Sequence, residues 1–552
     1  MKQKIFALFL ILCGLCLNLK AETQGDIVGR VLDDSGAPLV GATVQMVNTK
    51  GGVTTDEDGY FRIPYSKVGA VKVKVSYVGY QTQTFILKTD EKKGNQHVLR
   101  LQPDATALDQ VVVTATRTPK ALKDAPVVTR LITANDIKIA DATNIQDLLT
   151  EQMPGLEFGY AMNQETSLNM NGFGGNAVLF LVDGERLAGE TMDNVDYSRL
   201  NLDNVGRIEI VKGAASALYG ASAVAGVINI ISRENSEPWT ANVNTRYNDF
   251  NKEWRHGGSF SFNAGKWNSQ TSIQRTTSDE VQLTSPFDTE SNILHIYGGE
   301  TFNVKERLTY KLSNKVKLIG RGGYFARISN RSNYDDHYKD YSAGLKTVMN
   351  LSENDNLEIS YGFDQYDKTR FVNNERTHDH DYTNRQNTIR ALYSHIFGKN
   401  TLTAGADFLN DYLTTYQFAN NGSKTQNSYD AFAQFDYNPL QWLNIVASLR
   451  HDYFSASSQH ATTGRLALMT KWKGFSIRAN YAGGFRAPTL KEMYMNFDMA
   501  GMQMIYGNPD LKPEKSDNFN LALEHTGRVK NAGFLTGQYS LTLMGYYNKY
   551  DK

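Results

Sequence analysis

The sequence predicts a chain dominated by β-structure: a small β-sandwich, a mixed α+β domain and a large antiparallel transmembrane β-barrel. Apolar and polar residues alternate along much of the chain after Trp239, as in the run 357–364. Aromatic residues are abundant, with 30 Tyr and 26 Phe in 552 residues, although the mean hydropathy is only −0.44. Outward aromatic residues combined with inward polar ones are typical of outer-membrane barrels.

The first residues have the pattern of a secretory signal. A short basic start is followed by an apolar run at 5–17 and by the small residue Ala21. We therefore expect residues 1–21 to be removed during export. The only two cysteines, Cys13 and Cys16, lie inside this segment, so the mature chain would contain neither a thiol nor a disulfide. No other apolar run is long enough to predict a membrane helix.

The charge balance and the absence of catalytic motifs exclude several classes of protein. Lys and Arg together number 58 and so do Asp and Glu, which gives no basic character suited to nucleic acid. The chain lacks the H-E-x-x-H pattern of zinc hydrolases and the Gly-Lys-Ser/Thr pattern of phosphate-binding loops. We therefore expect a protein that is not an enzyme and that has no resident cofactor or metal.

Residues 22–102 are predicted to form the small β-sandwich. Short β-branched runs alternate there with turn clusters such as Asp33-Asp34-Ser35-Gly36. The string GRVLDDSGAPLVGATV, continued by TTDEDGYFRI and VSYVGYQTQTFIL, resembles the carboxypeptidase regulatory-like domain. That resemblance implies a non-enzymatic sandwich in the periplasm.

Residues 103–123 form a linker with one distinctive segment, Leu108–Thr116, which reads LDQVVVTAT. Three consecutive valines between polar and small residues predict a short extended segment with free backbone edges. Such a segment can add as a strand to the sheet of a partner, with main-chain hydrogen bonds supplying the affinity. The residues alone equally fit an ordinary strand.

Residues 124–236 are predicted to form the mixed domain, and its end, Arg207–Ser232, is RIEIVKGAASALYGASAVAGVINIIS. Two β-branched runs enclose small residues that permit close backbone approach. A short helix is expected over 144–149, with Thr143 as a candidate cap. The segment 179–184, LFLVDG, contains an Asp-Gly pair typical of a hairpin turn.

The stretch Arg207–Ser232 closely resembles the end of the plug domain of TonB-dependent outer-membrane receptors, and the chain resembles the Bacteroidetes type, in the siderophore, haem and cobalamin class. The resemblance implies a plug inside a barrel of 22 strands. It also identifies the valine segment as a TonB box. The implied TonB-binding residues are Asp109, Gln110, Val111, Val112, Val113, Thr114, Ala115 and Thr116.

Residues 237–552 are predicted to form the barrel. Short turns, such as 313–315 and 398–400, alternate with long polar loops, and the strands reach the ten or so residues needed to cross a bilayer. We count about fifteen strands, fewer than the family barrel contains, and therefore expect a partial, truncated barrel.

The cargo site is expected on the long loops. Phe485-Arg486-Ala487-Pro488 and Asn508-Pro509-Asp510-Leu511 resemble two boxes of these receptors that are prominent in haem receptors, although no histidine lies between them here. Thioether and imidazole groups both bind haem iron. The loop between the two boxes contains five methionines, and packing of this loop against the plug is their alternative role. The candidate cargo-binding residues are His378, His380, Met493, Met495, Met499, Met502 and Met504.

These features together predict an outer-membrane receptor for energy-coupled uptake of an iron complex, haem first and siderophore next. The expected partners are TonB with its inner-membrane energising complex, outer-membrane lipid and the cargo, with a surface lipoprotein as a further candidate and no nucleic acid. The alternatives are a cobalamin or other metal-complex receptor, a SusC-like glycan importer, and a structural or adhesive surface protein.

Overall fold

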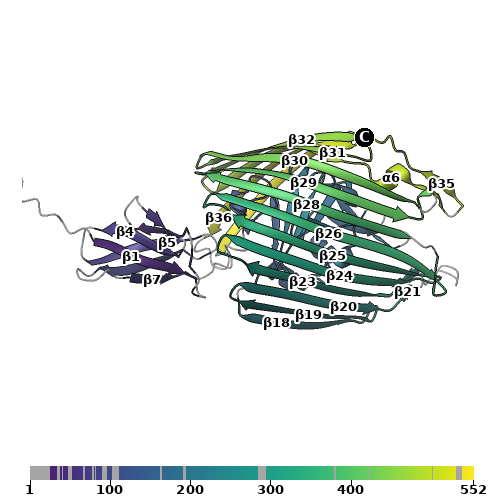
Figure 1. Cartoon of the computed structure of the whole chain (residues 1–552), viewed down its shortest axis with the longest axis horizontal. Helices are drawn as coiled ribbons and strands as arrows, with labels where there is room; N and C mark the ends of the chain where they lie inside the picture. Colours follow the sequence, from purple (N-terminus) through teal and green to yellow (C-terminus); the bar gives the residue numbers. More distant parts are fainter. Residues whose placement is uncertain are drawn as a thin grey trace, which may run out of the picture. The chain divides into compact units, whose positions relative to one another are not determined.

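A computed structural model gives the architecture of the chain (Figure 1). The chain divides into two compact units, Met1–Val111 and Val112–Lys552, and each is described by itself. The structure describes residues 25–551 except 34–35, 37, 40, 48–51, 57, 66–68, 78–79, 81, 90–95, 102–110, 162–163, 190–193, 236, 284–293, 378–380, 420–421, 500 and 530–536.

The first unit is a small β-sandwich, as predicted. One sheet has the strand order β4-β1-β7 and the other β3-β2-β5-β6, and β7 is parallel to β1. Between them lies an aliphatic core in which Val31, Val44 and Val73 are completely buried. The strands are β1 (Gly25–Leu32), β2 (Thr43–Met46), β3 (Gly52–Thr54), β4 (Tyr60–Tyr65), β5 (Gly69–Ser76), β6 (Gln83–Thr89) and β7 (Gln96–Arg100).

The second unit begins with the mixed α+β domain, which we call the plug. Its main sheet has the order β10-β16-β17-β14-β15, and β11, β12 and β13 form a second sheet. The elements are β8 (Val111–Val112), β9 (Lys120–Ala121), η2 (Leu122–Asp124), β10 (Thr129–Thr133), α3 (Ala134–Ala140), α4 (Ile145–Gln152), β11 (Leu156–Tyr160), β12 (Thr166–Met170), β13 (Phe173–Gly174), η3 (Gly175–Ala177), β14 (Val178–Val182), β15 (Glu185–Arg186), η4 (Tyr197–Arg199), β16 (Val205–Lys212), α5 (Ser216–Tyr219) and β17 (Gly226–Ser232).

The stretch Arg207–Ser232 forms β16 and β17, which are antiparallel neighbours within the main plug sheet, as its two β-branched runs predict. Between them, α5 comes close to the barrel wall. Gly220 has φ +74°, and a Cβ at this position would lie 2.6 Å from the guanidinium of Arg450. Glycine adopts this positive φ without strain and has no Cβ to meet Arg450. The small residues therefore allow the plug to contact the barrel closely.

Two local expectations for the plug have different outcomes. Asp183 and Gly184 join β14 to β15 with φ values of 52° and 85°, which is the two-residue hairpin turn expected from the Asp-Gly pair. The helix expected over 144–149 is α4, but the predicted N-cap is wrong by one residue. Asn144, and not Thr143, accepts the hydrogen bond from the backbone N–H of Asp147.

The large sheet is antiparallel and contains 16 strands, of which fifteen follow one another from β18 to β37 while β27 pairs beside β26 (Figure 1). Among the described residues β18 and β37 are its two edges. Its strands are β18 (Trp239–Asn248), β19 (Glu253–Ala264), β20 (Trp267–Ser278), β23 (Gly299–Lys311), β24 (Val316–Asn330), β25 (Asp335–Asn350), β26 (Asp355–Val372), β27 (Glu375–Arg376), β28 (Tyr382–Phe397), β29 (Asn400–Thr415), β30 (Ser423–Leu440), β31 (Leu443–Phe454), β32 (Gln459–Trp472), β33 (Phe475–Arg486), β36 (Glu514–Val529) and β37 (Gly537–Asp551).

The connections between these strands define two ends of the barrel. At the short-turn end, β32 and β33 are separated only by residues 473–474. At the long-loop end, residues 487–513 separate β33 from β36. They contain α6 (Leu490–Tyr494) and a hairpin of β34 (Asn496–Met499) and β35 (Gln503–Tyr506), while β21 (Val281–Leu283) and β22 (Leu294–Ile296) form another.

The alternation along the strands sorts polar residues inward and apolar residues outward. On β31, Ser448 and Arg450 are buried against the interior, while Leu449 between them is exposed on the outer surface. Plug and barrel share one apolar cluster, in which Leu218 and Val227 of the plug meet Phe432 and Val446 of the wall. Among the described residues, no helix has the length and apolarity needed to cross a membrane.

Candidate functional site at the plug–barrel interface

The first part of the site is the predicted TonB box, residues Asp109–Thr116, which we call the coupling segment. Asp109 and Gln110 lie outside the described residues. Val112, Thr114, Ala115 and Thr116 are buried, and Val111 and Val113 are half-buried. Residues 112–116 of the segment are therefore packed into the plug and the barrel wall.

A buried carboxylate holds this segment. Glu209, on β16, is completely buried, and its Oε2 accepts hydrogen bonds from the N–H groups of Val113 (2.8 Å) and Thr114 (2.7 Å). The Thr114 hydroxyl donates to the same oxygen at 2.7 Å, and Nε of Arg207 donates to Oε1 at 2.8 Å. A buried carboxylate needs such donors. Glu209 thus fixes the coupling segment, and the backbone edges expected to be free are occupied at Val113 and Thr114.

The other side of the segment is held by groups from the plug and the barrel. The Tyr219 hydroxyl donates to the carbonyl of Thr114 at 3.0 Å, and Nε2 of Gln434 donates to the carbonyl of Thr116 at 2.7 Å. Gln434 belongs to β30 of the barrel wall. The segment can therefore add to the sheet of a partner only after these hydrogen bonds break.

Arg117 directly follows the coupling segment and changes the direction of the chain sharply. Its φ of 60° is unusual for a residue other than glycine. Its guanidinium donates to the carbonyl of Leu218 at 2.8 Å and lies 3.8 Å from the centre of the Tyr219 ring. Burial lowers the pKa of Arg117, and the nearby charge of Arg390 adds to this effect. The residue links the linker to the end of α5.

We expect Glu209→Gln to expose the coupling segment. The change removes the charge of a carboxylate that accepts three hydrogen bonds from the segment, each worth about 1.5–3 kcal/mol when one partner is charged. The measurement is the rate of thiol labelling of Ala115→Cys, the sole cysteine once residues 1–21 are removed. We expect at least a tenfold faster rate in the Glu209→Gln background. Glu157→Gln, an exposed position on β11, is the control, and equal rates in all backgrounds would contradict this role of Glu209.

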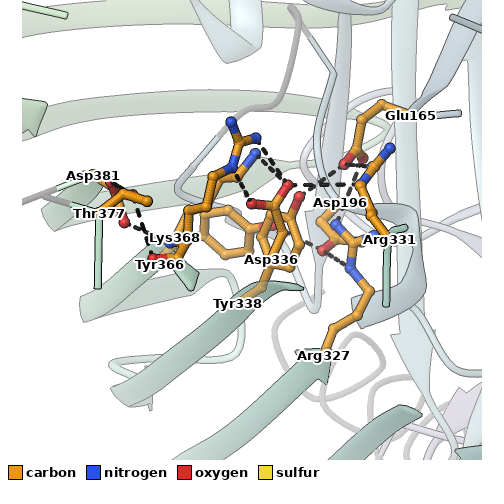
Figure 2. A network of polar contacts seen from close by, with 11 residues as sticks. Glu165, Asp196, Arg327, Arg331, Asp336, Tyr338, Tyr366, Lys368, Thr377 and Asp381 are labelled. Atoms are coloured by element: carbon orange, nitrogen blue, oxygen red, sulfur yellow. Dashed lines mark hydrogen bonds and ion pairs between the residues drawn. The ribbon is translucent and has the colours of Figure 1, made fainter. Parts of the chain in front are cut away.

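The second part of the site lies at the long-loop end, where two plug carboxylates meet the wall (Figure 2). Asp196 forms an ion pair with Arg327 at 3.0 Å and accepts a hydrogen bond from the Tyr366 hydroxyl at 2.8 Å. Glu165, between β11 and β12, accepts a hydrogen bond from the Tyr338 hydroxyl at 2.8 Å. Burial alone would raise the pKa of Asp196, but Arg327 and the hydrogen bonds outweigh it and lower that pKa.

A barrel carboxylate continues this network toward the loops. Asp336 on β25 is nearly completely buried and lies 3.1 Å from Nζ of Lys368 and 2.9 Å from Nε of Arg370. Nε of Arg331 lies 3.8 Å away, and Arg331 also reaches Glu165 at 3.5 Å. Four barrel cations and three carboxylates therefore form one network that connects plug and wall.

The cations of this network also lie over tyrosine rings. The guanidinium carbon of Arg327 is 3.8 Å from the ring centre of Tyr338, and that of Arg370 is 3.9 Å from the ring centre of Tyr334. Such pairs hold a cation by the negative face of the ring. The long-loop end of the barrel, which we call the mouth, therefore combines paired cations with tyrosine rings.

The two boxes resembling those of haem receptors form a clasp in the structure. Arg486 at the end of β33 donates to Glu514 at the start of β36 (2.8 Å) and to Glu492 on α6 (2.9 Å). The backbone N–H of Asn508 donates to the carbonyl of Glu492 at 2.9 Å. Glu492 also closes the capping box of α6 with Thr489. These contacts hold the base of the 487–513 loop.

The candidate cargo residues do not converge. Met493 is 1% exposed in a cluster with Leu490 and Tyr382, whereas Met502 and Met504 are 74% and 48% exposed on the β34–β35 hairpin. Met493 thus packs against side chains of the barrel, whereas the alternative role expected for it is packing against the plug. The remaining positions divide as follows: Met495 is half-buried beside Phe418, the side chain of Met499 is outside the described atoms, and His378 and His380 lie outside the described residues.

An anchor that sequence reasoning missed lies below the mouth. Arg199 of the plug is buried and bonds Asp340 at 2.6 Å and Asp364 at 2.8 Å, both on the barrel wall. It borders a cavity of about 130 Å³ between plug and wall, lined by charged residues that include Glu185 and Lys305. In the described part of the chain, no group of three or more His, Cys, Asp or Glu side chains is placed to hold a metal ion.

Comparisons with known families agree with this architecture. Residues 295–552 match the profile "TonB dependent receptor-like, beta-barrel", residues 121–227 match "TonB-dependent Receptor Plug Domain", and residues 27–113 match "CarboxypepD_reg-like domain". Together the first two profiles cover most of the second unit.

Curated relatives and solved structures point the same way. An iron-regulated outer membrane virulence protein of Vibrio cholerae is 25% identical over 460 residues, covering 78% of this chain and 68% of that protein. The vitamin B12 transporter BtuB of Photobacterium profundum is 25% identical over 448 residues, covering 77% and 69%. The siderophore receptor PirA of Pseudomonas aeruginosa superposes with a TM-score of 0.62 at 17% identity, covering 76% and 74%. The hemophore receptor HasR of Serratia marcescens superposes with a TM-score of 0.62 at 13% identity, covering 78% of this chain and 74% of that chain. The chain thus belongs to the TonB-dependent receptors, a family of outer-membrane receptors that are not enzymes, and carries a carboxypeptidase regulatory-like domain before its plug.

Proposed function

We propose that this receptor takes up an iron complex, a ferric siderophore or haem, across the outer membrane in a step energised by TonB. The observation that carries the proposal is the mouth network, where Arg327, Lys368 and Arg370 lie among tyrosine rings. Ferric siderophores with aromatic chelating groups, and haem with its propionates, combine negative charge with flat aromatic surface. The names of several relatives, which include iron-regulated and ferric enterobactin receptors, also support an iron cargo.

The arrangement of the two parts of the site supports a route from cargo to TonB. An anionic cargo at the mouth would compete with Glu165 and Asp196 for Arg327 and so loosen the plug from the wall. The coupling segment lies toward the short-turn end, where Lys120, four residues after Thr116, bonds Asp436 at 2.6 Å. Released from Glu209, the segment would add to a sheet of TonB by main-chain hydrogen bonds.

This function implies a placement in the cell. Residues 1–21 would direct export, the sandwich and the coupling segment would face the periplasm, and the long loops would face outward. TonB acts with its inner-membrane complex, and a surface lipoprotein that delivers cargo is a further partner we propose. Because relatives include a vitamin B12 transporter, cobalamin is the second candidate cargo.

Growth of a deletion strain tests the cargo. The strain is complemented with the receptor and supplied in turn with haem, ferric siderophores, cobalamin and glycans as the limiting nutrient. We expect the receptor to restore growth on an iron complex. A second strain is complemented with the variant Arg327→Ala/Arg370→Ala, which should have a lower affinity for the cargo. Restoration on cobalamin or glycan alone would contradict the iron proposal.

Haem is distinguished from a siderophore by a titration of the complete receptor. If haem is the cargo, the Soret band shifts on binding, and His378→Ala/His380→Ala or Met499→Ala/Met502→Ala reduces that shift, because imidazole and thioether both ligate haem iron. The absence of a shift in the parent receptor would exclude haem and leave a siderophore. A shift that neither pair changes would keep haem and assign its ligands to other residues.

A further inference from the structure

Two histidines face one another on the outer surface of the barrel. His451 on β31 and His460 on β32 bring Nε2 and Nδ1 to 3.3 Å, with ring centres 5.4 Å apart. Both side chains are exposed, whereas Arg450 and Asp452 beside His451 are buried against the interior. The pair therefore points away from the plug and has no role in the site described above.

The distance between the two nitrogens matches two ligands of one metal ion. Zn²⁺ binds imidazole nitrogen at about 2.0–2.1 Å, and tetrahedral geometry then places two such nitrogens about 3.3 Å apart. The other ring nitrogen of His451, Nδ1, lies 2.8 Å from the Thr462 hydroxyl. A hydrogen bond at that position fixes the ring and leaves the lone pair of Nε2 toward the partner histidine, as is usual for histidines that bind metals.

The strands themselves hold this geometry. In the register of β31 and β32, His451 lies opposite Thr462, and Tyr453 lies opposite His460. The two histidines are thus diagonal neighbours on one face, close enough for long side chains to meet. The Tyr453 ring packs 4.8 Å from that of His460, which limits the positions open to the imidazole.

The surroundings leave room for water or other ligands. His460 is one residue from the start of β32, beside the 455–458 connection at the long-loop end. Tyr429 and Tyr453 continue the row of outward aromatic rings, a feature of the interfacial level of such barrels.

We propose that His451 and His460 form a binding site for a late first-row divalent cation such as Zn²⁺, with water in the remaining coordination positions. Imidazole is a preferred ligand of this class of metal, and the two neutral rings would replace two of its water molecules. Each ring would keep its proton on the far nitrogen, Nδ1 in His451 and Nε2 in His460. The bound ion would join β31 to β32 on the outside of the barrel, independently of the cargo at the mouth.

The test is titration of Zn²⁺ alone into the untagged complete receptor in detergent, by calorimetry, with Co²⁺ absorption as a second readout of coordination. His378→Ala/His380→Ala serves as the background, so that the loop histidines do not contribute. We expect one Zn²⁺ per chain at micromolar concentration. His451→Asn or His460→Asn should weaken binding at least tenfold, and Thr462→Val several-fold. His337→Asn, at an outward histidine on β25 whose ring packs against Phe371, should leave binding unchanged.

The variants lie on the exposed face, and heat-modifiable migration in gels checks that each barrel is folded. No saturable Zn²⁺ binding by the parent receptor would overturn the proposal. Equal affinity in the parent and in both folded histidine variants would do the same. Loss of binding in His337→Asn to the extent seen in His451→Asn would show non-specific capture and would also overturn it.

Discussion

Replacing Val112 with proline in the complete receptor is expected to reduce uptake to background while surface binding of cargo is preserved. Proline removes the backbone N–H and restricts the preceding residue, so the coupling segment can no longer form a regular added strand. Removal of residues 109–116 should have the same effect. The measurement is uptake of radiolabelled iron cargo, with cargo binding at low temperature measured in parallel.

Val112→Ala separates the backbone effect from packing. Val112 is completely buried beside Ala125 and Leu131, so the alanine variant loses apolar contacts but keeps the N–H. We expect it to retain most of the uptake. Normal uptake in the proline variant, or in the variant without the segment, would show that TonB engages another part of the chain.

Replacing Arg199 with alanine is expected to detach the plug from the barrel wall. The change leaves Asp340 and Asp364 buried without their shared partner, and the loss of one member of a buried ion pair costs about 3–5 kcal/mol. The measurements are the melting temperature of the purified receptor and the sensitivity of cells to large antibiotics that an intact plug excludes. Both the loss of stability and the leak should be large.

Arg246→Ala is the matched control, because Arg246 of β18 also joins the plug to the wall, through Asp141. Their side chains are 38% and 76% exposed. An exposed ion pair contributes about 1 kcal/mol or less, so this variant should behave like the parent. Similar behaviour of the two variants would mean that Arg199 does not anchor the plug.

The fold could be predicted largely because it depends on local periodicity. Alternation along the barrel region gave about fifteen strands, and fifteen follow one another in the sheet. The β-branched runs of Arg207–Ser232 gave β16 and β17. The cap of α4 was missed because adjacent Thr143 and Asn144 both suit an N-cap, and only the backbone conformation decides between them.

The candidate site could be predicted only in part, because its contacts join distant positions. The valines identified the coupling segment, but its partner Glu209 is 95 residues from Thr114. A signal for that partner was present, since Glu209 is an acidic residue between Ile208 and Ile210 in a buried β-branched run. The closeness of the methionines in the sequence predicts one group, yet helical spacing directs Met493 into the interior together with Leu490.

The Arg486 clasp has a consequence for how such receptors change their specificity. Because Arg486 binds both Glu492 and Glu514, the two ends of the 487–513 loop are joined below the β34–β35 hairpin. The hairpin itself makes its ladder internally, from Asn496↔Tyr506 to Met499↔Gln503. We therefore expect that its tip can be exchanged as a unit if Phe497, which packs against Tyr416, is kept, so that grafting residues 498–505 from a receptor for another cargo offers a direct route to redirected uptake.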